Sequence, residues 1–120
     1  MHELAICQAL LARVESIARE YAASVTRVRV SIGPLSGVEP GLLERAYPIA
    51  CAGTAAEGSE LAIERAPVRV RCRSCGVESA ASANRLLCGA CGDWHTDLAS
   101  GDELLLLNVE LNRDAVAVET

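Results

Sequence analysis

Aromatic residues are almost absent from this chain of 120 residues, which has no phenylalanine and keeps only Tyr21, Tyr47 and Trp94. Its hydrophobic core must therefore be built from alanine, valine, leucine and isoleucine. Proteins that bind single-stranded nucleic acid without sequence preference stack the bases on aromatic side chains. Three scattered rings do not supply such a platform.

Histidine is also scarce, with only His2 and His95. A hydrolytic zinc centre commonly takes histidine and carboxylate ligands and keeps one position open for water, and two histidines do not suffice for a histidine-rich centre. The loop from Gly33 to Gly37 lacks the glycine patterns of phosphate-binding and dinucleotide-binding loops. These absences argue against an enzyme.

Long apolar runs are missing as well. The longest cluster, Leu104–Leu107, has the size of a strand, whereas a membrane-spanning helix needs about 20 apolar residues. No basic segment followed by a long apolar run opens the chain. We therefore expect a cytoplasmic protein without a membrane span, in which thiols stay reduced.

Cysteine, in contrast, is abundant, and four of the six cysteines form two pairs of identical spacing. Cys72 and Cys75 make the first pair, Cys88 and Cys91 the second, and a glycine follows each pair. A disulfide or a redox Cys-x-x-Cys motif is the alternative, but two matched pairs favour one metal cage. Zn(II) takes four ligands in a tetrahedron, and a four-thiolate site is closed and structural. The sequence therefore predicts a zinc ribbon with these four ligands.

The net charge is −5, which disfavours general nucleic-acid binding because such binding neutralises phosphates. The segment from residue 65 to residue 91 is nevertheless basic. A zinc ion with four thiolates carries a net negative charge, which nearby guanidinium groups would offset. We interpret the basic segment in this way and expect no nucleic-acid partner. The segment has one acid, Glu78, and five arginines: Arg65, Arg69, Arg71, Arg73 and Arg85.

Two helices are predicted in the first half of the chain. Apolar residues recur at steps of three and four from Glu3 to Tyr21, which indicates an amphipathic helix. A second helix should begin at Glu39-Pro40 and run toward Ala52. Pro48 should bend or interrupt it, because proline lacks the amide donor. Cys7 and Cys51 lie within these two segments, and we interpret them as small core thiols rather than ligands.

Three segments alternate as strands do. They cover residues 25–32, 60–64 and 105–111, and a further short apolar segment leads into Cys72. A helix between the first two strands permits a right-handed crossover that makes them parallel. The expected fold class is α/β, a small mixed three-stranded sheet with two helices and an inserted four-cysteine zinc-ribbon knob.

The ribbon divides the sequence into three parts. We expect a discontinuous α/β domain from residues 1–68 and 101–113, and a ribbon domain from residues 69–100. Residues 114–120 should form a frayed tail.

The start of the chain, Met1-His2-Glu3, offers a second metal site. A free α-amine, the next amide nitrogen and Nδ1 of His2 form fused five- and six-membered chelate rings around one metal ion. Such a nitrogen set suits square-planar Ni(II) or Cu(II). His95, in the loop that leaves the ribbon, would add an imidazole if the ribbon folded back toward the first helix. The alternative for His95 is an exposed loop residue.

Five segments that follow one another in this chain resemble the HypA/HybF family of hydrogenase nickel-incorporation proteins. The resemblance extends over essentially the whole chain. The combination of a Met-His-Glu start with a four-cysteine ribbon is its most specific part. The segments are Met1–Leu4, Gly37–Pro40, Glu57–Leu61, the two Cys-x-x-Cys-Gly motifs, and Gly101–Leu104.

This resemblance implies a nickel metallochaperone that helps insert Ni(II) into the large-subunit precursor of [NiFe] hydrogenase. It implies a nickel-handling GTPase of the maturation pathway as a partner. The family's nickel site maps onto Met1, His2 and Glu3, with His95 as the only further imidazole, and its zinc site maps onto the four paired cysteines. Nickel is then transient cargo and zinc a structural cofactor. The alternative is a zinc-ribbon adaptor that binds RNA or a protein, in which His2 has no role.

Overall fold

In the computed structural model, two compact units make up the chain, and the structure describes residues 2–112 and 115–117. The first unit consists of Met1–Ser31, Val38–Glu64 and Leu105–Thr120. The second consists of Ile32–Gly37 and Arg65–Leu104. The ribbon cysteines thus belong to a unit whose two segments alternate in the sequence with the three segments of the other unit.

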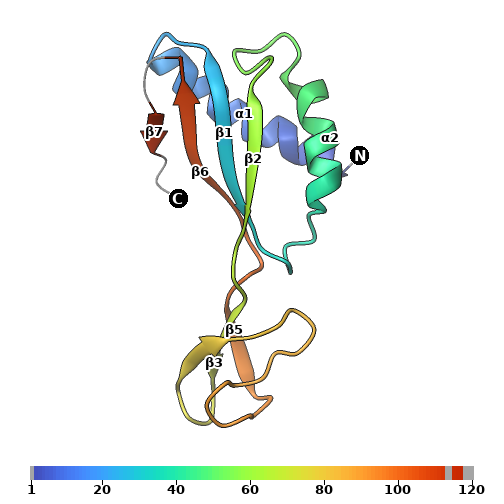
Figure 1. Ribbon diagram of the computed structural model, residues 1–120, viewed down its shortest axis with the longest axis vertical. Coiled ribbons are helices and arrows are strands. Elements are labelled where there is room, and N and C mark those ends of the chain that lie inside the picture. Colours follow the sequence, from blue (N-terminus) through green and yellow to red (C-terminus); the bar gives the residue numbers. More distant parts are fainter. Residues whose placement is uncertain (1, 113–114, 118–120) are drawn as a thin grey trace. The chain divides into compact units, whose positions relative to one another are not determined.

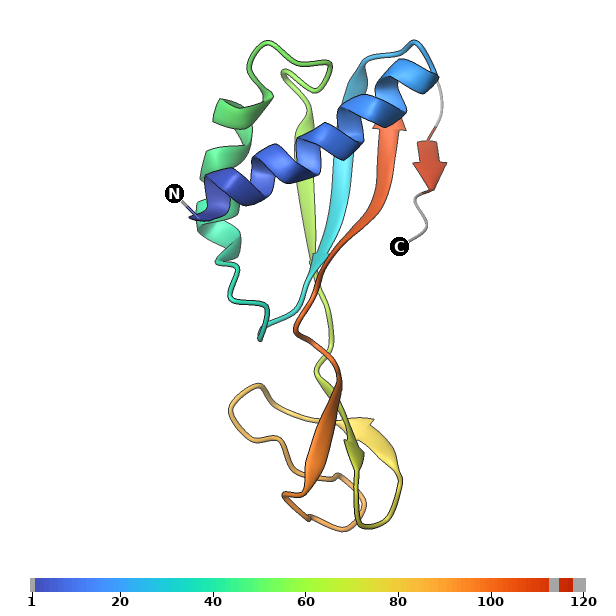
Figure 2. The ribbon, with the colours of Figure 1, turned by 180° about the vertical axis from the view of Figure 1, so that it is seen from behind.

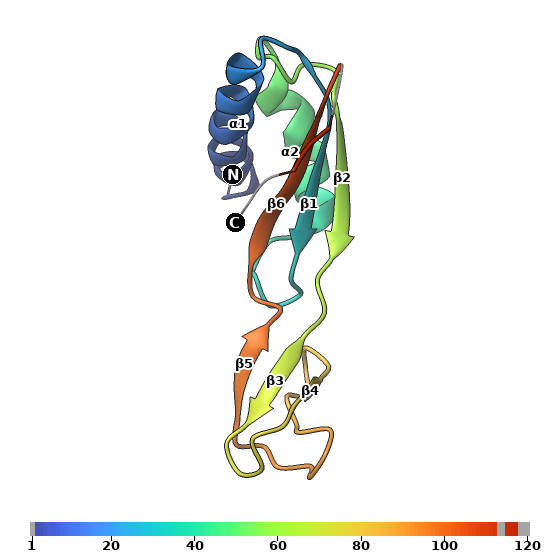
Figure 3. The same ribbon diagram turned by 90° about the vertical axis from the view of Figure 1, so that its left-hand side faces the viewer.

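The first unit is an α/β arrangement, as the alternating segments predict (Figure 1). Its sheet has the strand order β2-β1-β6-β7. The strands β1 and β2 run in the same direction and β6 runs opposite to them, so the sheet is mixed (Figure 3). The elements are α1 (His2–Glu20), β1 (Val25–Ile32), α2 (Pro40–Cys51), β2 (Glu60–Arg65), β6 (Leu104–Leu111) and β7 (Ala115–Ala117).

An aliphatic core joins the two helices to this sheet. The helix α1 crosses one face of the sheet with α2 beside it (Figure 2). Val28 and Val30 of β1 are fully buried, while Arg29 between them is partly exposed. Cys7 and Cys51 are buried too, and the thiol of Cys7 donates to the carbonyl of Leu43 at 3.7 Å. Their interpretation as core thiols is therefore confirmed.

The helix α2 begins and ends close to the predicted bounds. Glu39 caps it, because its side chain accepts from the amide of Gly41 at 3.2 Å and satisfies one of the free donors at the helix start. The expected interruption at Pro48 is wrong, since the helix continues through this residue to Cys51. A proline removes one helical hydrogen bond, and the buried Leu43, Ala46 and Tyr47 hold the helix in place by packing.

The end of the chain differs from the expectation of a frayed tail over residues 114–120. Ala115–Ala117 form β7 and pair antiparallel with Asn108–Glu110 of β6. The sheet therefore has a fourth, short strand. The rest of the predicted tail lies outside the described residues.

The second unit is built on a smaller antiparallel sheet of order β4-β3-β5. Its strands are β3 (Arg69–Cys72), β4 (Glu78–Ala80) and β5 (Thr96–Ser100). The sequence did not predict β4 and β5 as strands. Both are short and largely exposed, so they lack the apolar alternation that marks a half-buried strand.

A close approach of two backbone segments holds the base of the second unit. The amide of Gly33 donates to Glu103 O at 2.9 Å, and the amide of Leu35 donates to Gly101 O at 2.8 Å. A Cβ added at Gly33 would collide with the carbonyl group of Gly101. Only glycine fits this position.

The Gly33→Ala variant should therefore be strongly destabilised. We expect a loss of roughly 3 kcal/mol, the upper end of the cost of overpacking, because the colliding atoms belong to the backbone. Denaturant unfolding followed by the fluorescence of Trp94, the single tryptophan, measures this loss in the second unit. Gly41→Ala is the matched control, since no atom lies closer than 3.5 Å to its added Cβ. Equal midpoints for the two variants would refute the argument.

Candidate metal centres

The four paired cysteines converge on one point of the second unit. Their sulfur atoms all lie within 4.8 Å of one another. The Cys72 Sγ to Cys91 Sγ and Cys75 Sγ to Cys88 Sγ distances are both 3.6 Å. A tetrahedron with Zn–S bonds of about 2.3 Å has edges of roughly 3.8 Å, whereas a disulfide bond is about 2.05 Å long. The cluster therefore has the dimensions of a four-thiolate metal site, and all four cysteines are free thiols.

The two Cys-x-x-Cys turns have matching backbone conformations. The carbonyl of each first cysteine accepts from the glycine after the pair, from Gly76 at 3.0 Å and from Gly92 at 2.9 Å. Both glycines have φ near +75°, at 75° and 77°, a conformation that a side chain disfavours. The chain thus curls over each sulfur, as the glycine after each pair predicts.

Backbone amides also point at the sulfurs. Cys72 Sγ accepts from the amide of Cys75 at 3.4 Å, and Cys88 Sγ accepts from Ala90 at 3.3 Å and Cys91 at 3.4 Å. The amides of Cys91 and Ala90 lower the pKa of the Cys88 thiol to about 6. The amide of Cys75 likewise lowers the pKa of Cys72. Because only thiolates bind zinc, these amides favour the metal-binding form of Cys72 and Cys88.

Three arginines of the basic segment have partners other than the thiolates. Arg69 and Arg71 both pair with Glu78, at 2.9 and 3.4 Å. Arg73 forms a two-armed contact with Asp97. These three arginines pair with carboxylates instead of offsetting the charge of the thiolates as the sequence led us to expect. At the sulfurs, the backbone amides described above supply the positive ends of dipoles.

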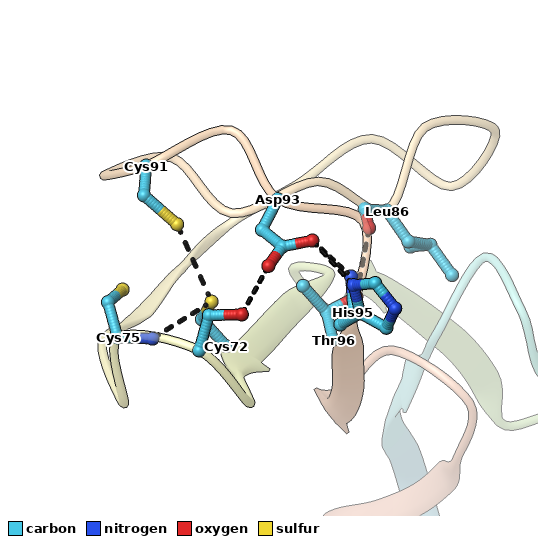
Figure 4. Close-up of polar contacts among 8 residues, drawn as sticks. Cys72, Cys75, Leu86, Cys91, Asp93, His95 and Thr96 are labelled. Carbon is cyan, nitrogen blue, oxygen red and sulfur yellow. Dashed lines mark hydrogen bonds and ion pairs between the residues drawn. The ribbon is translucent and has the colours of Figure 1, made fainter.

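His95 lies in the turn between the second cysteine pair and β5 (Figure 4). Its Nδ1 is 2.7 Å from Asp93 Oδ1, and its ring stacks on Trp94 with a centroid separation of 3.8 Å. The other carboxylate oxygen of Asp93 accepts from the hydroxyl of Ser74 in the first turn. Hydrogen bonds from Ser74 and then from the amide of His95 hold the pKa of Asp93 well below its usual range.

The predicted nickel site at the start of the chain is described in part. Met1 and the side chain of His2 lie outside the described residues, while α1 begins at His2. The carboxylate of Glu3 accepts from the amide of Glu39 at 3.5 Å, next to the start of α2. Glu3 also borders an open cavity of about 250 Å³ with Leu4, Leu42, Arg45, Ala46 and Ile49.

Sequence reasoning missed Asp93 and Ser74 as parts of the cysteine site. The carboxylate of an aspartate commonly accepts from the backbone amide two positions ahead. The amide of His95 does donate to Asp93 in this way, at 3.0 Å. The contact between Asp93 and the amide of His95 could therefore have been predicted from the sequence. The contact with Ser74 depends on how the two turns fold together and has no local signature.

Comparison with known proteins gives consistent matches. The chain matches, over residues 1–111, the family described as hydrogenase/urease nickel incorporation, metallochaperone, HypA. The hydrogenase maturation factor HypA of Nitrosospira multiformis is 54% identical over 112 residues, which are 92% of this chain and 97% of that protein. The corresponding factor of Aquifex aeolicus is 46% identical over 115 residues, 95% of this chain and 100% of that protein.

Solved structures support the fold. The solution structure of the Ni metallochaperone HypA from Helicobacter pylori has a TM-score of 0.67 at 23% identity, and covers 91% of this chain and 96% of that one. A second HypA solution structure has a TM-score of 0.72 at 24% identity, with 92% and 96% coverage. Likenesses at this identity concern the fold, and they confirm the α/β class with a ribbon knob.

These matches also decide between the predicted functions. A family of metallochaperones is not a family of enzymes, so the interpretation of the chain as non-enzymatic is confirmed. Among the described residues, no helix combines the length and the apolar character that a membrane crossing requires. The match over residues 1–111 and the identity of 54% to a curated relative show that this chain belongs to the HypA family of hydrogenase/urease nickel-incorporation metallochaperones.

Proposed function

We propose that this chain carries Ni(II) for hydrogenase maturation at Met1, His2 and Glu3, and that Cys72, Cys75, Cys88 and Cys91 hold a structural Zn(II). Family membership supports the nickel function. The observation that carries the site assignment is that α1 begins at His2.

A helix start suits amide coordination of nickel. The first four N–H groups of an α-helix have no acceptor within the helix. An amide at this position can therefore lose its proton to a metal ion without breaking a helical hydrogen bond. The positive end of the helix dipole also favours the negative charge left on the nitrogen. Square-planar Ni(II) accepts an amine, such an amide nitrogen and an imidazole as ligands.

The cysteine cluster suits zinc as a resident ion. Its sulfur separations of 3.6 Å are close to the tetrahedral value given above. Four thiolates leave no open position for substrate or water, so zinc there would stabilise the fold rather than react. The two sites then differ in purpose, since a closed cage retains its ion and a site at a chain end, with few ligands, releases its own.

The partners follow from this division. A carrier of nickel for [NiFe] hydrogenase must meet the large-subunit precursor that receives the ion. We propose a nickel-handling GTPase of the same pathway as the second partner, with the cytoplasm as the compartment where all three meet. Ni(II) competes with Cu(II), which binds nitrogen ligands more strongly, so delivery depends on partners as well as affinity.

The zinc-ribbon adaptor, our alternative, is not favoured. The family match extends to residue 1 and includes the Met-His-Glu start. An adaptor has no use for that start. In addition, three arginines of the ribbon are already paired with carboxylates and are less available to phosphates.

Isothermal titration of Ni(II) into untagged His2→Ala protein tests the proposal. We expect an affinity for Ni(II) at least about 100-fold weaker than in the unmodified chain. Loss of a residue that only hydrogen-bonds to a metal ligand costs up to about 100-fold, and loss of a ligand itself should cost at least as much. Gln8→Ala, an exposed change on the same helix, should leave the isotherm unchanged. His95→Ala should have a smaller effect than His2→Ala. Full affinity in the His2 variant would contradict the assigned nickel site.

A further inference from the structure

The imidazole of His95 is held on several sides although half of its side chain, 51%, is exposed. Asp93 Oδ1 accepts from the backbone amide at 3.0 Å and contacts Nδ1 at 2.7 Å. Trp94 covers one ring face, with an interplanar angle of 29°. The amide of Arg73 donates to His95 O at 2.8 Å and fixes the backbone. So many contacts are unusual for an exposed histidine that has no function, because its side chain could otherwise remain free in water.

The residue that imposes the ring orientation, Asp93, is itself anchored to both cysteine turns. Its carboxylate accepts from the hydroxyl of Ser74, between Cys72 and Cys75. Its backbone carbonyl accepts from the amide of Cys88 at 2.9 Å. The carboxylate thus contacts both Ser74 in the first turn and the imidazole, and Figure 4 shows Asp93 beside His95. The orientation of His95 is therefore set by the folded ribbon.

The contact with Asp93 also selects one chemical form of the ring. An ionised carboxylate is only an acceptor, so a neutral imidazole beside it must carry its proton on Nδ1. Nε2 then keeps its lone pair and is the nitrogen able to bind a metal ion. Histidines that bind metals in proteins commonly have such a carboxylate at the other nitrogen, where it fixes the proton and strengthens the ligand.

We propose that Asp93 is a positioning residue that presents Nε2 of His95 as a ligand for a late first-row divalent metal ion in transit. The ion's other ligands come from elsewhere. Imidazole suits Ni(II), Cu(II) and Zn(II), and Ni(II) as the physiological ion rests on the proposed function. The competing explanation is that Asp93 only caps the turn and that its contact with the ring has no consequence for metals.

The His2→Ala variant isolates His95, because the chain has two histidines and this change leaves one. In the ¹⁵N-labelled, zinc-loaded variant, long-range ¹⁵N–¹H correlation at about pH 8, where an ordinary imidazole is neutral, reports which ring nitrogen carries the proton. We expect the Nδ1–H form, whereas free histidine prefers Nε2–H. The Nε2–H form in this protein would overturn the proposal without any further variant.

Substitutions of Asp93 in the same background test the link to metal binding. The probe is Cu(II)–iminodiacetate, a chelate with open positions that a single imidazole fills. Asp93→Ala should shift the ring to Nε2–H and weaken binding about tenfold, the lower end of the range for loss of such a carboxylate. Asp93→Asn keeps an acceptor oxygen and should rescue the Nδ1–H form and most of the affinity. Asp102→Asn, an exposed change in the same unit, should have no effect.

Zinc content separates these effects from loss of the fold. If Asp93→Ala retains zinc and leaves both the ring form and the affinity unchanged, Asp93 only caps the turn and the proposal fails. If this variant loses zinc, the ring form of the parent and the behaviour of Asp93→Asn decide the question. The His2→Ala background lacks the proposed nickel site, so the outcome does not depend on whether that site exists.

Discussion

Replacing Cys75 by serine should release the structural zinc that we propose and unfold the second unit, while the first unit stays folded. Binding of structural zinc contributes apparent free energies of about 10–16 kcal/mol in small zinc domains, and a serine hydroxyl does not replace a thiolate. The second unit has little else to hold it together. Its buried apolar side chains are Ile32, Val68, Val70, Cys72 and Cys88, and two of these five are themselves in the metal cluster.

The first unit should not depend on that ion. Its core contains Val14, Leu43 and Val109, all fully buried, together with most of the other buried residues of the described chain. A core of this kind supports a fold without metal. Circular dichroism should therefore keep the helical signal of α1 and α2, while the fluorescence of Trp94 reports unfolding around it.

A chromogenic chelator measures the released zinc at the same time. Val77→Ser is the matched control, because it places serine at a partly exposed residue beside the cysteine turn and leaves all four thiols in place. This control should keep its zinc. A parallel loss of the helical signal in Cys75→Ser would show that the two units fold as one, against this prediction.

Periodicity and spacing predicted the elements that bury a continuous apolar face. The stripe of α1, the alternation of β1 and the run of leucines in β6 each carry their pattern locally, and all three elements begin and end within a few residues of the predicted bounds. The four cysteines came from spacing, and the structure brings their sulfurs together. In these cases the residue types themselves encode the contacts.

The remaining parts depend on contacts between distant segments. The strand β4 exists because Arg69–Arg71 pair with Glu78–Ala80, and its three residues have no pattern of their own. The helix α2 continues through Pro48 because its packing outweighs the lost hydrogen bond, and propensity alone favours a break there. The contact of Ser74 with Asp93 likewise needs both cysteine turns in place before it forms.

Extending the chain at its N-terminus should change nickel binding in opposite directions, depending on the length of the extension. In the site that we propose, the α-amine, the amide nitrogen of His2 and its Nδ1 form two fused chelate rings around Ni(II). Four added residues move the amine out of reach and convert the old one into an amide. We expect this extension to weaken Ni(II) binding about 100-fold, because the amine no longer holds the metal at a high effective concentration beside the imidazole.

A single glycine before Met1 should have the reverse effect. His2 then becomes the third residue, so that the new amine, two amide nitrogens and Nδ1 offer four nitrogens in three fused rings. Four nitrogens complete the square plane that Ni(II) favours, and each added ring holds its donor at a high effective concentration, so we expect affinity about tenfold tighter or more. The same change should slow the release of Ni(II). A carrier must be able to release its ion, so the extended protein should deliver nickel poorly.

Titration of Ni(II) into the three untagged proteins measures both effects, and a four-residue extension at the C-terminus is the control. In the His2→Ala background the single glycine should give no gain, since the fourth nitrogen is then missing. Equal affinities for all three N-termini would mean that the α-amine does not bind nickel, and the proposed site at the start of α1 would be wrong. Loss with four residues and gain with one is a pattern that only a chelate anchored on the α-amine and His2 explains.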